Sequence, residues 1–493
     1  MSDKTPKYIT TTLPYVNSSP HIGFATELVR ADAYARYFKL MGHPVFLNTG
    51  TDEHGQKIYD KAQEAGKDTQ SFVDELAEEF KKLLPELGIL PEANFVRTTD
   101  EHHKHAAQEM WRRCKEKGDI YKATHAVKYC KGCELEKTDS ELDHGKCPLH
   151  PNDEIEVREE ENYFFRFSKY QQALLDLYEQ ADFVVPDFRL AEIKKFVEGG
   201  LQDFSVSRLK TKMAWGVPVP DDEEHVMYVW FDALTNYISV TGWPEKADFG
   251  GWWPGVQFAG KDNLRQQSAI WQAMLLSAEL PTSTQIFIGG FINSGGQKMS
   301  KSLGNVISPY ELTARYGTEA TRYLLLRHVH PFEDTDITWD RLDEWYTANL
   351  VNGLGNLTAR IMKMAETHLD APVEVPNVSF LDDQGVGLSE LKNFDFQKTL
   401  DYIWSGNDQI EWYMSLSIKT VDEKIQVTEP YKRIKSELGE EIESAKEIIK
   451  FLVIQLWYKA VELEPYMPET SRVIREAVLT NKKPENLFAR LES

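Results

Sequence analysis

The chain has 493 residues, of which 41% are hydrophobic and 27% are charged. At roughly 150 residues per domain this length predicts about three domains, and the composition excludes a disordered chain, a collagenous chain and a small disulfide scaffold. No run of about 18 apolar residues is present, so the sequence predicts no transmembrane helix. The residues before Ile9 include no apolar signal segment, so we expect a cytoplasmic protein.

The chain is strongly acidic, with 56 lysines and arginines against 78 aspartates and glutamates, and its net charge is −22. Proteins that bind nucleic acid without regard to sequence usually present a basic field, so this balance argues against that class. Any contact with RNA would have to rest on local basic residues, base stacking and shape.

The first part of the chain alternates strand and helix patterns. Residues 7–13 are rich in β-branched side chains and predict a buried strand, and residues 23–38 follow with the periodicity of a helix. A second strand is expected at residues 44–49, which makes a βαβ unit and therefore a parallel sheet. Further helices are expected at residues 60–82 and 101–117.

Residues 119–200 differ in texture, because short charged turns surround three cysteines, and we expect an insertion with a small fold of its own. Strand patterns of a parallel sheet return at residues 226–231, 256–259 and 285–288. From about residue 340 the pattern is helical, with helices expected at 346–365, 391–427 and 442–463. The sequence thus predicts an α/β fold, a Rossmann-type doubly wound parallel sheet with a connective insertion, followed by an α-helical bundle. The expected domain ranges are 1–118, 119–200, 201–339 and 340–493.

Four potential metal ligands follow the spacing Cys130-x2-Cys133-x13-Cys147-x2-His150. Each pair closes a tight turn, and two such turns facing one another supply the four tetrahedral ligands of zinc. All four positions are filled by protein ligands, so we expect one structural zinc ion, whose binding would supply folding energy to a polar insertion. Cys114 lies outside this spacing and is expected to be a buried helix residue.

Two segments have the composition of phosphate-binding loops. Residues 20–24, Pro-His-Ile-Gly-Phe, lie where the first strand meets the first helix, and at such a junction a doubly wound sheet binds ligands and a helix N-terminus offers N–H groups. In residues 289–304, glycines flank Lys298 and Lys301, with hydroxyl side chains nearby. We expect this second loop to close as a cationic clamp on a polyphosphate.

These segments, taken in order, resemble motifs of the methionyl-tRNA synthetases, a family of class I aminoacyl-tRNA synthetases. His21-Ile22-Gly23 stands where that class has its HIGH motif, and residues 298–302, Lys-Met-Ser-Lys-Ser, match its KMSKS motif in full. Further matches are found at Leu13-Pro14-Tyr15 and at residues 50–55, 228–233, 260–262 and 356–360. The cysteine pattern resembles the connective insertion of family members with a single zinc knuckle. The resemblance covers nearly the whole chain.

The resemblance implies an ATP-dependent ligase that acts in two steps. Methionine and ATP, with Mg²⁺, give methionyl-adenylate and pyrophosphate, and the methionyl group then passes to the terminal ribose of methionine tRNA, initiator or elongator. The implied catalytic residues are His21, Lys298 and Lys301. The implied ATP site consists of His21, Gly23, Lys261, Asp262, Lys298, Ser300 and Lys301. The implied methionine site consists of Leu13, Tyr15, Asp52, Trp230, Ala233, Tyr237, Gln267 and Trp271.

Within the implied methionine site, Asp52 would hold the α-ammonium group, because a carboxylate is the natural partner of a buried cation. Trp230, Tyr237 and Trp271 would surround the thioether, which suits aromatic edges. Discrimination against leucine could not rest on size alone, since one methylene group is worth only about 1–3 kcal/mol.

Three positions depart from the family pattern. Phe24 replaces a second histidine that usually approaches ATP, and Gln267 stands where the family commonly has a histidine near the sulfur, although an amide can still donate a hydrogen bond there. Tyr431 replaces a tryptophan and is expected to stack on an anticodon base. Asn356 and Arg360, one helical turn apart, would read base edges from the same face.

Two alternatives to this interpretation remain open. One is a related synthetase for leucine, isoleucine, valine or cysteine, although residues 119–200 leave no room for a large editing insertion. The other is a catalytically lapsed paralogue that only binds tRNA or a regulator. The chain carries no basic appendage after the bundle of the kind that some relatives use to dimerise, so we expect a monomer.

Overall fold

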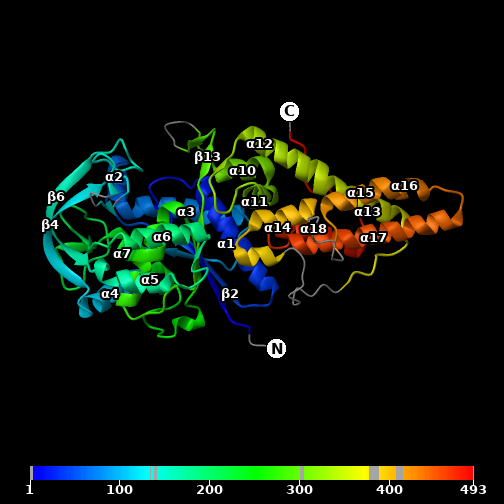
Figure 1. The fold of residues 1–493 in the computed structure, drawn as a ribbon. Coiled ribbons are helices and arrows are strands. Elements are labelled where there is room, and N and C mark those ends of the chain that lie inside the picture. Colours follow the sequence, from blue (N-terminus) through cyan, green and yellow to red (C-terminus); the bar gives the residue numbers. More distant parts are fainter. Residues whose placement is uncertain are drawn as a thin grey trace.

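The computed structural model describes residues 4–133, 135–137, 141–299, 305–376, 388–406 and 415–491. Figure 1 shows an elongated molecule, in which the long strands β4 (Ile120–Cys130) and β6 (Ile155–Phe165) lie at one end and helices of the C-terminal third extend to the other. Within these described ranges, no helix is long and apolar enough to cross a membrane.

The α/β part is built on a six-stranded parallel sheet with the strand order β3-β2-β1-β11-β12-β7. Its strands, in chain order, are β1 (Lys7–Thr11), β2 (Val45–Thr51), β3 (Asn94–Arg97), β7 (Val184–Val185), β11 (Val256–Gly260) and β12 (Gln285–Gly289). The predicted βαβ unit and doubly wound sheet are therefore confirmed. The strand order reverses between β1 and β11, and such a switch point is where doubly wound sheets bind ligands at the carboxyl ends of their strands.

Successive side chains of the central strands belong to two different hydrophobic clusters. Ile9 and Phe258 pack in the cluster that contains α1 (Ile22–Leu40), whereas Tyr8 and Ala259 pack in the cluster that contains α4 (Glu101–Glu116) and α9 (Trp271–Ser277). Both faces of the sheet are thus buried, as expected for parallel strands covered by crossover helices.

Apart from α3, which has 18 residues, the remaining helices of the α/β part have 12 residues or fewer. They are α2 (Gln56–Glu64), α3 (Thr69–Glu86), α5 (Gln171–Leu177), α6 (Asp187–Glu198), α7 (Val229–Ala233), α8 (Asn236–Ser239), α10 (Pro309–Tyr316), α11 (Thr318–Arg327) and α12 (Trp339–Trp345). Single-turn segments of 3-10 or π type described in this part are η2 (Phe167–Tyr170), η3 (Phe249–Gly251), η4 (Lys261–Asn263) and η5 (Gln266–Ile270).

The expected insertion is a separate antiparallel sheet. Strands β4 and β6 pair along their whole length, from Ile120 opposite Phe165 to Cys130 opposite Ile155, and β5 (Leu135–Glu136) and β8 (Phe204–Ser205) complete four strands. The chain returns to the parallel sheet within the expected insertion range, because β7 pairs with β12.

The prediction of a parallel strand at residues 226–231 is wrong. Strand β10 (His225–Met227) pairs antiparallel with β9 (Ser207–Leu209), and α7 begins directly afterwards at Val229. A short apolar run can form either a strand or a buried helix, and periodicity alone does not separate the two. A small three-stranded sheet follows later in the chain, made of β13 (Ile292–Ser294), β14 (Gln297–Lys298) and β15 (Thr335–Asp336).

The C-terminal third of the described chain is helical, as predicted. It contains η7 (Tyr346–Gly355), α13 (Asn356–His368), η8 (Leu388–Asn393), α14 (Phe396–Ser405), α15 (Ile418–Thr428), α16 (Pro430–Arg433), α17 (Gly439–Leu463) and α18 (Pro468–Thr480). The apolar side chains of these helices share a cluster with α1, and the ring of Phe394 stacks on Tyr34 at 4.7 Å. The helical part therefore packs directly on the first helix of the α/β part.

A buried arginine fastens this junction. Arg322 of α11 is fully buried, and it pairs with the equally buried Asp32 of α1 at 2.7 Å. The same guanidinium donates hydrogen bonds to the carbonyl oxygens of Tyr466 at 2.7 Å, Pro465 at 3.2 Å and Leu87 at 3.0 Å. One side chain thus joins α1, α11 and the turn between α17 and α18.

Candidate active site

The first expected phosphate loop lies at the switch point of the sheet. His21 is the N-cap of α1, and its Nδ1 accepts a hydrogen bond from the backbone N–H of Gly23 at 3.1 Å. A Cβ atom on residue 23 would lie 2.9 Å from His21 Cε1, so glycine lets the imidazole fold over the start of the helix. The ring is thus held at the helix N-terminus, where backbone N–H groups and the helix dipole favour an anion. Phe24 is buried against Phe80 and faces the core rather than a ligand.

The carboxyl ends of β11 and β12 lie beside this loop, since β1 pairs with β11 and Gly260 lies opposite Gly289. Lys261, which follows β11, pairs with both carboxylate oxygens of Asp334 at 2.7 Å, and Asp334 also accepts the backbone N–H of Phe291 at 3.0 Å. Lys261 is therefore held in an ion pair in this structure.

The second expected phosphate loop continues from β12 through β13 and β14. The backbone of Lys298 pairs with Asn293 in β14, while Ser300 and Lys301 lie outside the described residues. Asp262 is exposed beside Lys261 and adds negative charge at the same edge of the sheet. The loop that contains the predicted lysines thus leaves the sheet two strands away from the loop of His21.

Two residues of the expected methionine-binding site meet just beyond the ends of β1 and β2. Tyr15 and Asp52 form a parallel bridge, in which Val16 N–H donates to the Asp52 carbonyl at 3.1 Å and Asp52 N–H donates to the Pro14 carbonyl at 3.0 Å. Asp52 is buried, and Leu13, also on this segment, is half-buried. These bonds fix the Asp52 backbone beside the segment that follows β1.

Tyr237, Gln267 and Trp271 form the buried wall of this site. The Gln267 amide donates from Nε2 to the Tyr237 hydroxyl at 2.7 Å, and the rings of Tyr237 and Trp271 meet edge-on with centroids 5.7 Å apart. Gln267 Oε1 accepts in turn from Gln257 Nε2 at 3.0 Å, so the orientation of the Gln267 amide is fixed. Gln267, which stands where the family commonly has a histidine, therefore holds the Tyr237 hydroxyl in place.

The other two residues of the expected methionine-binding site, Trp230 and Ala233, lie on α7. The next helix, α8, carries Tyr237. Trp230 and Tyr15 pack against the same pair of buried residues, Tyr228 and Val229. Burial, and then the negative charges of Glu27 and Asp52, raises the pKa of the Tyr237 phenol, so the Asp52 carboxylate and the tyrosine share one electrostatic environment. Residues from four separate segments of the chain thus converge.

Sequence reasoning missed two polar residues of this region, the half-buried Glu27 and the buried Gln257. Glu27 of α1 accepts hydrogen bonds from the Thr12 backbone N–H at 2.7 Å and the Thr12 hydroxyl at 2.6 Å, and burial raises its pKa to about 8. Gln257 of β11 fixes Gln267 as described above. Gln257 is the only polar side chain of β11, a pattern that could have singled it out, whereas Glu27 lies among other charged residues of α1 and has no such signal.

The four expected zinc ligands are brought together in the insertion. Cys133 Sγ lies 3.3 Å from Cys147 Sγ and 3.2 Å from His150 Nδ1, and the ligand atoms of all four residues, including Cys130, lie within 4.8 Å of one another. Three sulfurs and one imidazole nitrogen are the donors that a structural zinc site uses, so these residues fit zinc. In the described part of the chain, no other group of three or more histidine, cysteine or acidic side chains is arranged to hold a metal.

Two of the three expected anticodon residues share a cavity in the helical part. Arg360 of α13 and Tyr431 of α16 line a space of about 420 Å³ between α13, α15 and α16, together with Lys363 and Lys483. The Tyr431 side chain is 41% exposed, which leaves its ring face open for stacking. Asn356 is exposed at the start of α13 and does not line this cavity.

Comparison with known proteins identifies the family of this chain. The sequence model of the family described as "tRNA synthetases class I (M)" matches residues 7–154 and 149–362. A methionine–tRNA ligase of Thermotoga maritima is 40% identical over 496 residues, covering 97% of this chain and 76% of that protein. Another, from Thermosynechococcus vestitus, is 46% identical over 378 residues, covering 75% and 70%.

Among solved structures, methionyl-tRNA synthetase of Mycobacterium tuberculosis in complex with methionyl-adenylate superposes with a TM-score of 0.86 at 33% identity, covering 95% of this chain and 93% of that one. The apo form of the same enzyme gives a TM-score of 0.81 at 28% identity, covering 99% of each chain. The matches in sequence and in fold extend over most of the chain, and the chain therefore belongs to the class I tRNA synthetases of the methionine type.

Proposed function

We propose that this chain is an ATP-dependent methionine–tRNA ligase of the cytoplasm. It activates methionine with ATP to methionyl-adenylate and pyrophosphate, and it then transfers the methionyl group to the terminal ribose of methionine tRNA, initiator or elongator. The names of the relatives and the methionyl-adenylate complex of the M. tuberculosis enzyme support both the amino acid and the first step.

The convergence of Asp52 with Tyr237, Gln267 and Trp271 is the observation that carries the proposal. A free amino acid needs a carboxylate for its ammonium group and a pocket for its side chain. Asp52 supplies the first, and the aromatic wall supplies contacts suited to a thioether. Because Gln267 donates to the Tyr237 oxygen, the phenol keeps its own proton to donate to an acceptor of the substrate.

In the activation step, a carboxylate oxygen of methionine attacks the α-phosphorus of ATP, a new P–O bond forms, and the bond to the bridging oxygen of the β-phosphate breaks to release pyrophosphate. The chain's part is to position the reactants and to stabilise negative charge. His21 acts from the start of α1, and Lys298 and Lys301 act on the departing phosphates. Mg²⁺ bound with ATP would neutralise part of the same charge.

The ion pair of Lys261 with Asp334 assigns that lysine a second task. It links the end of β11 to the segment after β12, from which the loop of Lys298 starts. We therefore propose that Lys261 shapes the ATP site through this link, while Asp262 and Gly23 line the nucleotide.

In the transfer step, a hydroxyl oxygen of the terminal ribose attacks the methionyl carbonyl carbon, the bond from that carbon to the phosphate oxygen breaks, and AMP leaves with its electron pair while the hydroxyl proton passes to solvent. The tRNA is recognised at its anticodon by residues 340–493. There, Tyr431 stacks on a base, Arg360 binds in the same cavity, and Asn356 contacts the RNA from the adjoining helix start. This distribution suits an acidic protein, because a few local contacts take the place of a basic field.

Cys130, Cys133, Cys147 and His150 would hold one zinc ion, which would stabilise the fold of residues 119–200 rather than take part in the chemistry. Lys57 Nζ donates to the carbonyl oxygen of Gly132 at 3.1 Å, and Cys133 packs, as Trp230 does, against the cluster of Tyr228 and Val229. The knuckle therefore also supports the outer side of the methionine site.

The test is methionine-dependent exchange of labelled pyrophosphate into ATP, followed by charging of methionine tRNA. We expect exchange with methionine and not with leucine, isoleucine, valine or cysteine. Exchange with one of those amino acids instead would assign the chain to another specificity. Absence of exchange with any amino acid would identify a lapsed paralogue.

A further inference from the structure

The segment that carries Asp52 is buried along its whole length, from Thr51 to Gly55. Asp52 is followed by two residues, Glu53 and His54, whose side chains are also buried and charged or titratable. Buried polar groups of this kind are costly unless they are fully paired, so their partners report what the fold holds in place.

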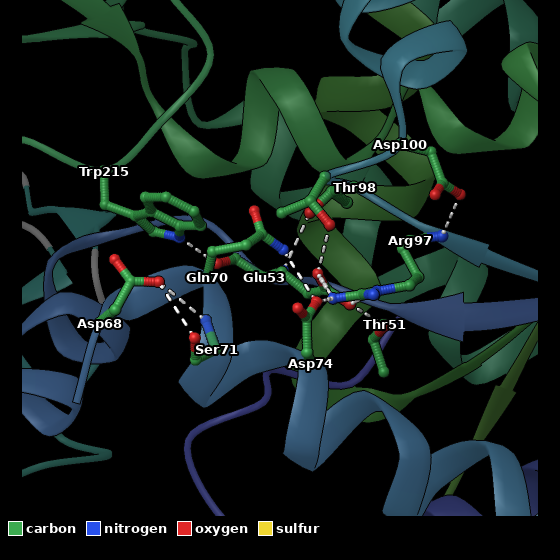
Figure 2. A network of polar contacts seen from close by, with 11 residues as sticks. Thr51, Glu53, Asp68, Gln70, Ser71, Asp74, Arg97, Thr98, Asp100 and Trp215 are labelled. Carbon is green, nitrogen blue, oxygen red and sulfur yellow. Dashed lines mark hydrogen bonds and ion pairs between the residues drawn. The ribbon is translucent and has the colours of Figure 1, made fainter. Parts of the chain in front are cut away.

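Glu53 is bound by residues at the ends of β2 and β3. Its carboxylate accepts from both Nε and Nη2 of Arg97, at 2.7 and 2.8 Å, and from the Thr51 hydroxyl at 2.6 Å. Its backbone is fixed as well, because its N–H donates to the Thr98 hydroxyl at 2.9 Å and its carbonyl accepts from Trp215 Nε1 at 2.6 Å. Figure 2 shows these side chains closing around Glu53 from several segments. This residue fixes one end of the Asp52 peptide.

His54 is anchored to a different element. Its Nδ1 lies 2.6 Å from Oδ2 of Asp232, and the other carboxylate oxygen of Asp232 lies 2.9 Å from Nε2 of His103. Both Asp232 and His103 are completely buried. Burial alone would raise the pKa of Asp232, but the two histidines outweigh it and hold the pKa at about 2, so the carboxylate is ionised and both rings donate to it.

We call the contacts from His54 through Asp232 to His103 the bridge, and its central residue, Asp232, lies on α7. The same short helix carries Trp230 and Ala233, and His103 also contacts Ser239 of α8 at 3.2 Å, two residues after Tyr237. The bridge therefore connects the segment with the expected ammonium-binding carboxylate to both helices of the expected aromatic wall.

We propose that Asp232, acting through His54, is a positioning residue for the amino-acid site, which sets the separation between the Asp52 carboxylate and the wall formed by α7 and α8. It touches neither methionine nor ATP. This inference rests on the proposed methionine specificity, and it assigns the bridge to recognition of the ammonium group rather than of the thioether or the nucleotide.

Asp232→Asn removes the charge with little change in volume. In the exchange assay, we expect the KM for methionine to rise about 10- to 100-fold, because a buried charge-assisted pair is lost, while the KM for ATP stays within about two-fold. Asp119→Asn is the matched control: this buried carboxylate is bound elsewhere, by Lys169 at 2.6 Å and Ser277 at 2.9 Å, so its loss should leave the methionine KM unchanged.

Two competitive ligands separate recognition from general damage. L-Methioninol carries the ammonium group, and 4-(methylthio)butan-1-ol is the same molecule without it. Asp232→Asn should weaken methioninol about 10- to 100-fold and the deaminated alcohol no more than about two-fold. Added to Asp52→Asn, it should weaken methioninol no further, since coupled residues are not additive. Equal weakening of both ligands, or additive losses, would overturn the proposal.

His54 provides a second test that does not depend on the folding of the Asp232 variant. His54→Asn keeps an N–H near the position of Nδ1 and should retain most of the methionine affinity, whereas His54→Leu should lose it with the same ligand dependence. Similar losses in both variants would also overturn the proposal. If the wild-type chain shows no methionine-dependent exchange, the proposed function itself fails. If the wild-type chain does show this exchange but the variants leave the methionine KM unchanged, only the proposed role of Asp232 is refuted.

Discussion

Replacement of Arg322 by methionine should destabilise the whole chain more than any surface substitution. The guanidinium is completely buried and joins Asp32 of α1 to the carbonyl oxygens of Leu87, Pro465 and Tyr466. Methionine has a similar length and flexibility, so the change removes the polar contacts while leaving little empty volume.

The magnitude follows from what remains after the substitution. The carbonyls of Leu87, Pro465 and Tyr466 lose a donor, at about 1 kcal/mol each. The Gly88 carbonyl, 3.4 Å from Arg322 Nη1, still accepts from Arg36 Nη2 at 2.8 Å. Asp32 is not left alone, because Arg36 Nε still pairs with it at 2.7 Å and the Leu90 N–H still donates to it at 2.8 Å. The loss of one of its partners therefore adds about 1–2 kcal/mol, at the low end of the cost of breaking a buried pair. Together these give about 4–5 kcal/mol.

Urea unfolding followed by tryptophan fluorescence measures this loss, and the 12 tryptophans give a strong signal. The control is Arg341→Met, since that side chain is half-exposed and contacts the backbone of its own neighbourhood, so it should cost less than about 0.5 kcal/mol. A loss below about 1 kcal/mol for the Arg322 variant would show that this junction does not hold the helical part on α1, and the reasoning would fail.

Four further changes test the site and its surroundings. Gln267→Leu removes the donor to the Tyr237 hydroxyl, which should cost about 1–3 kcal/mol of binding free energy. The methionine KM in pyrophosphate exchange should therefore rise roughly 5- to 150-fold while the ATP KM stays unchanged. An unaltered methionine KM would contradict this. Cys147→Ser should abolish stoichiometric zinc in elemental analysis of the purified protein, and retention of the metal would show that the knuckle is not the site. Tyr431→Ala should raise the KM for tRNA roughly 5- to 150-fold by loss of about 1–3 kcal/mol of stacking, while exchange without tRNA is unaffected; an equal loss of exchange would refute the anticodon role. Burial raises the pKa of Glu27 to about 8, so the folded chain binds the proton of this carboxyl group more tightly than the unfolded chain does. The stability that this proton contributes is full below about pH 4.5 and is lost as the pH rises toward 8. Glu27→Gln should flatten that decline in urea midpoints, and identical pH curves for variant and wild type would refute the assignment.

Local patterns predicted the parts of the fold in which neighbouring residues decide the structure. The strand at residues 7–13, the helix after it and the second strand all form, and the knuckle ligands meet as their spacing implies. The run at 226–231 failed because a helix and a strand can both bury a short apolar segment. The helix expected over 391–427 is interrupted, since α14 ends at Ser405, before Gly406 with its φ of 80°, and α15 starts only at Ile418.

The candidate site was predictable as far as single residues match a pattern, and not where partners come from distant segments. Asp52 belongs to the motif at residues 50–55 and Trp230 to the one at 228–233, but the pairing of Lys261 with Asp334 depends on how two loops meet after folding. In the same way, nothing local indicates that His54 and His103, on different elements, share the carboxylate of Asp232. Tertiary contacts of this kind decide which charged side chains remain available to a ligand.

The central pairing of the sheet also dictates the order in which the chain can mature. Strand β1 pairs with β11, with Ile9 opposite Val256, so the first strand of the protein waits at the ribosome until more than half of the polypeptide has been made. During that interval β1, β2 and β3 can associate, but one edge stays open, and closing it is a slow, long-range step. Nascent chains stalled before β11 should therefore be the ones that chaperones retain.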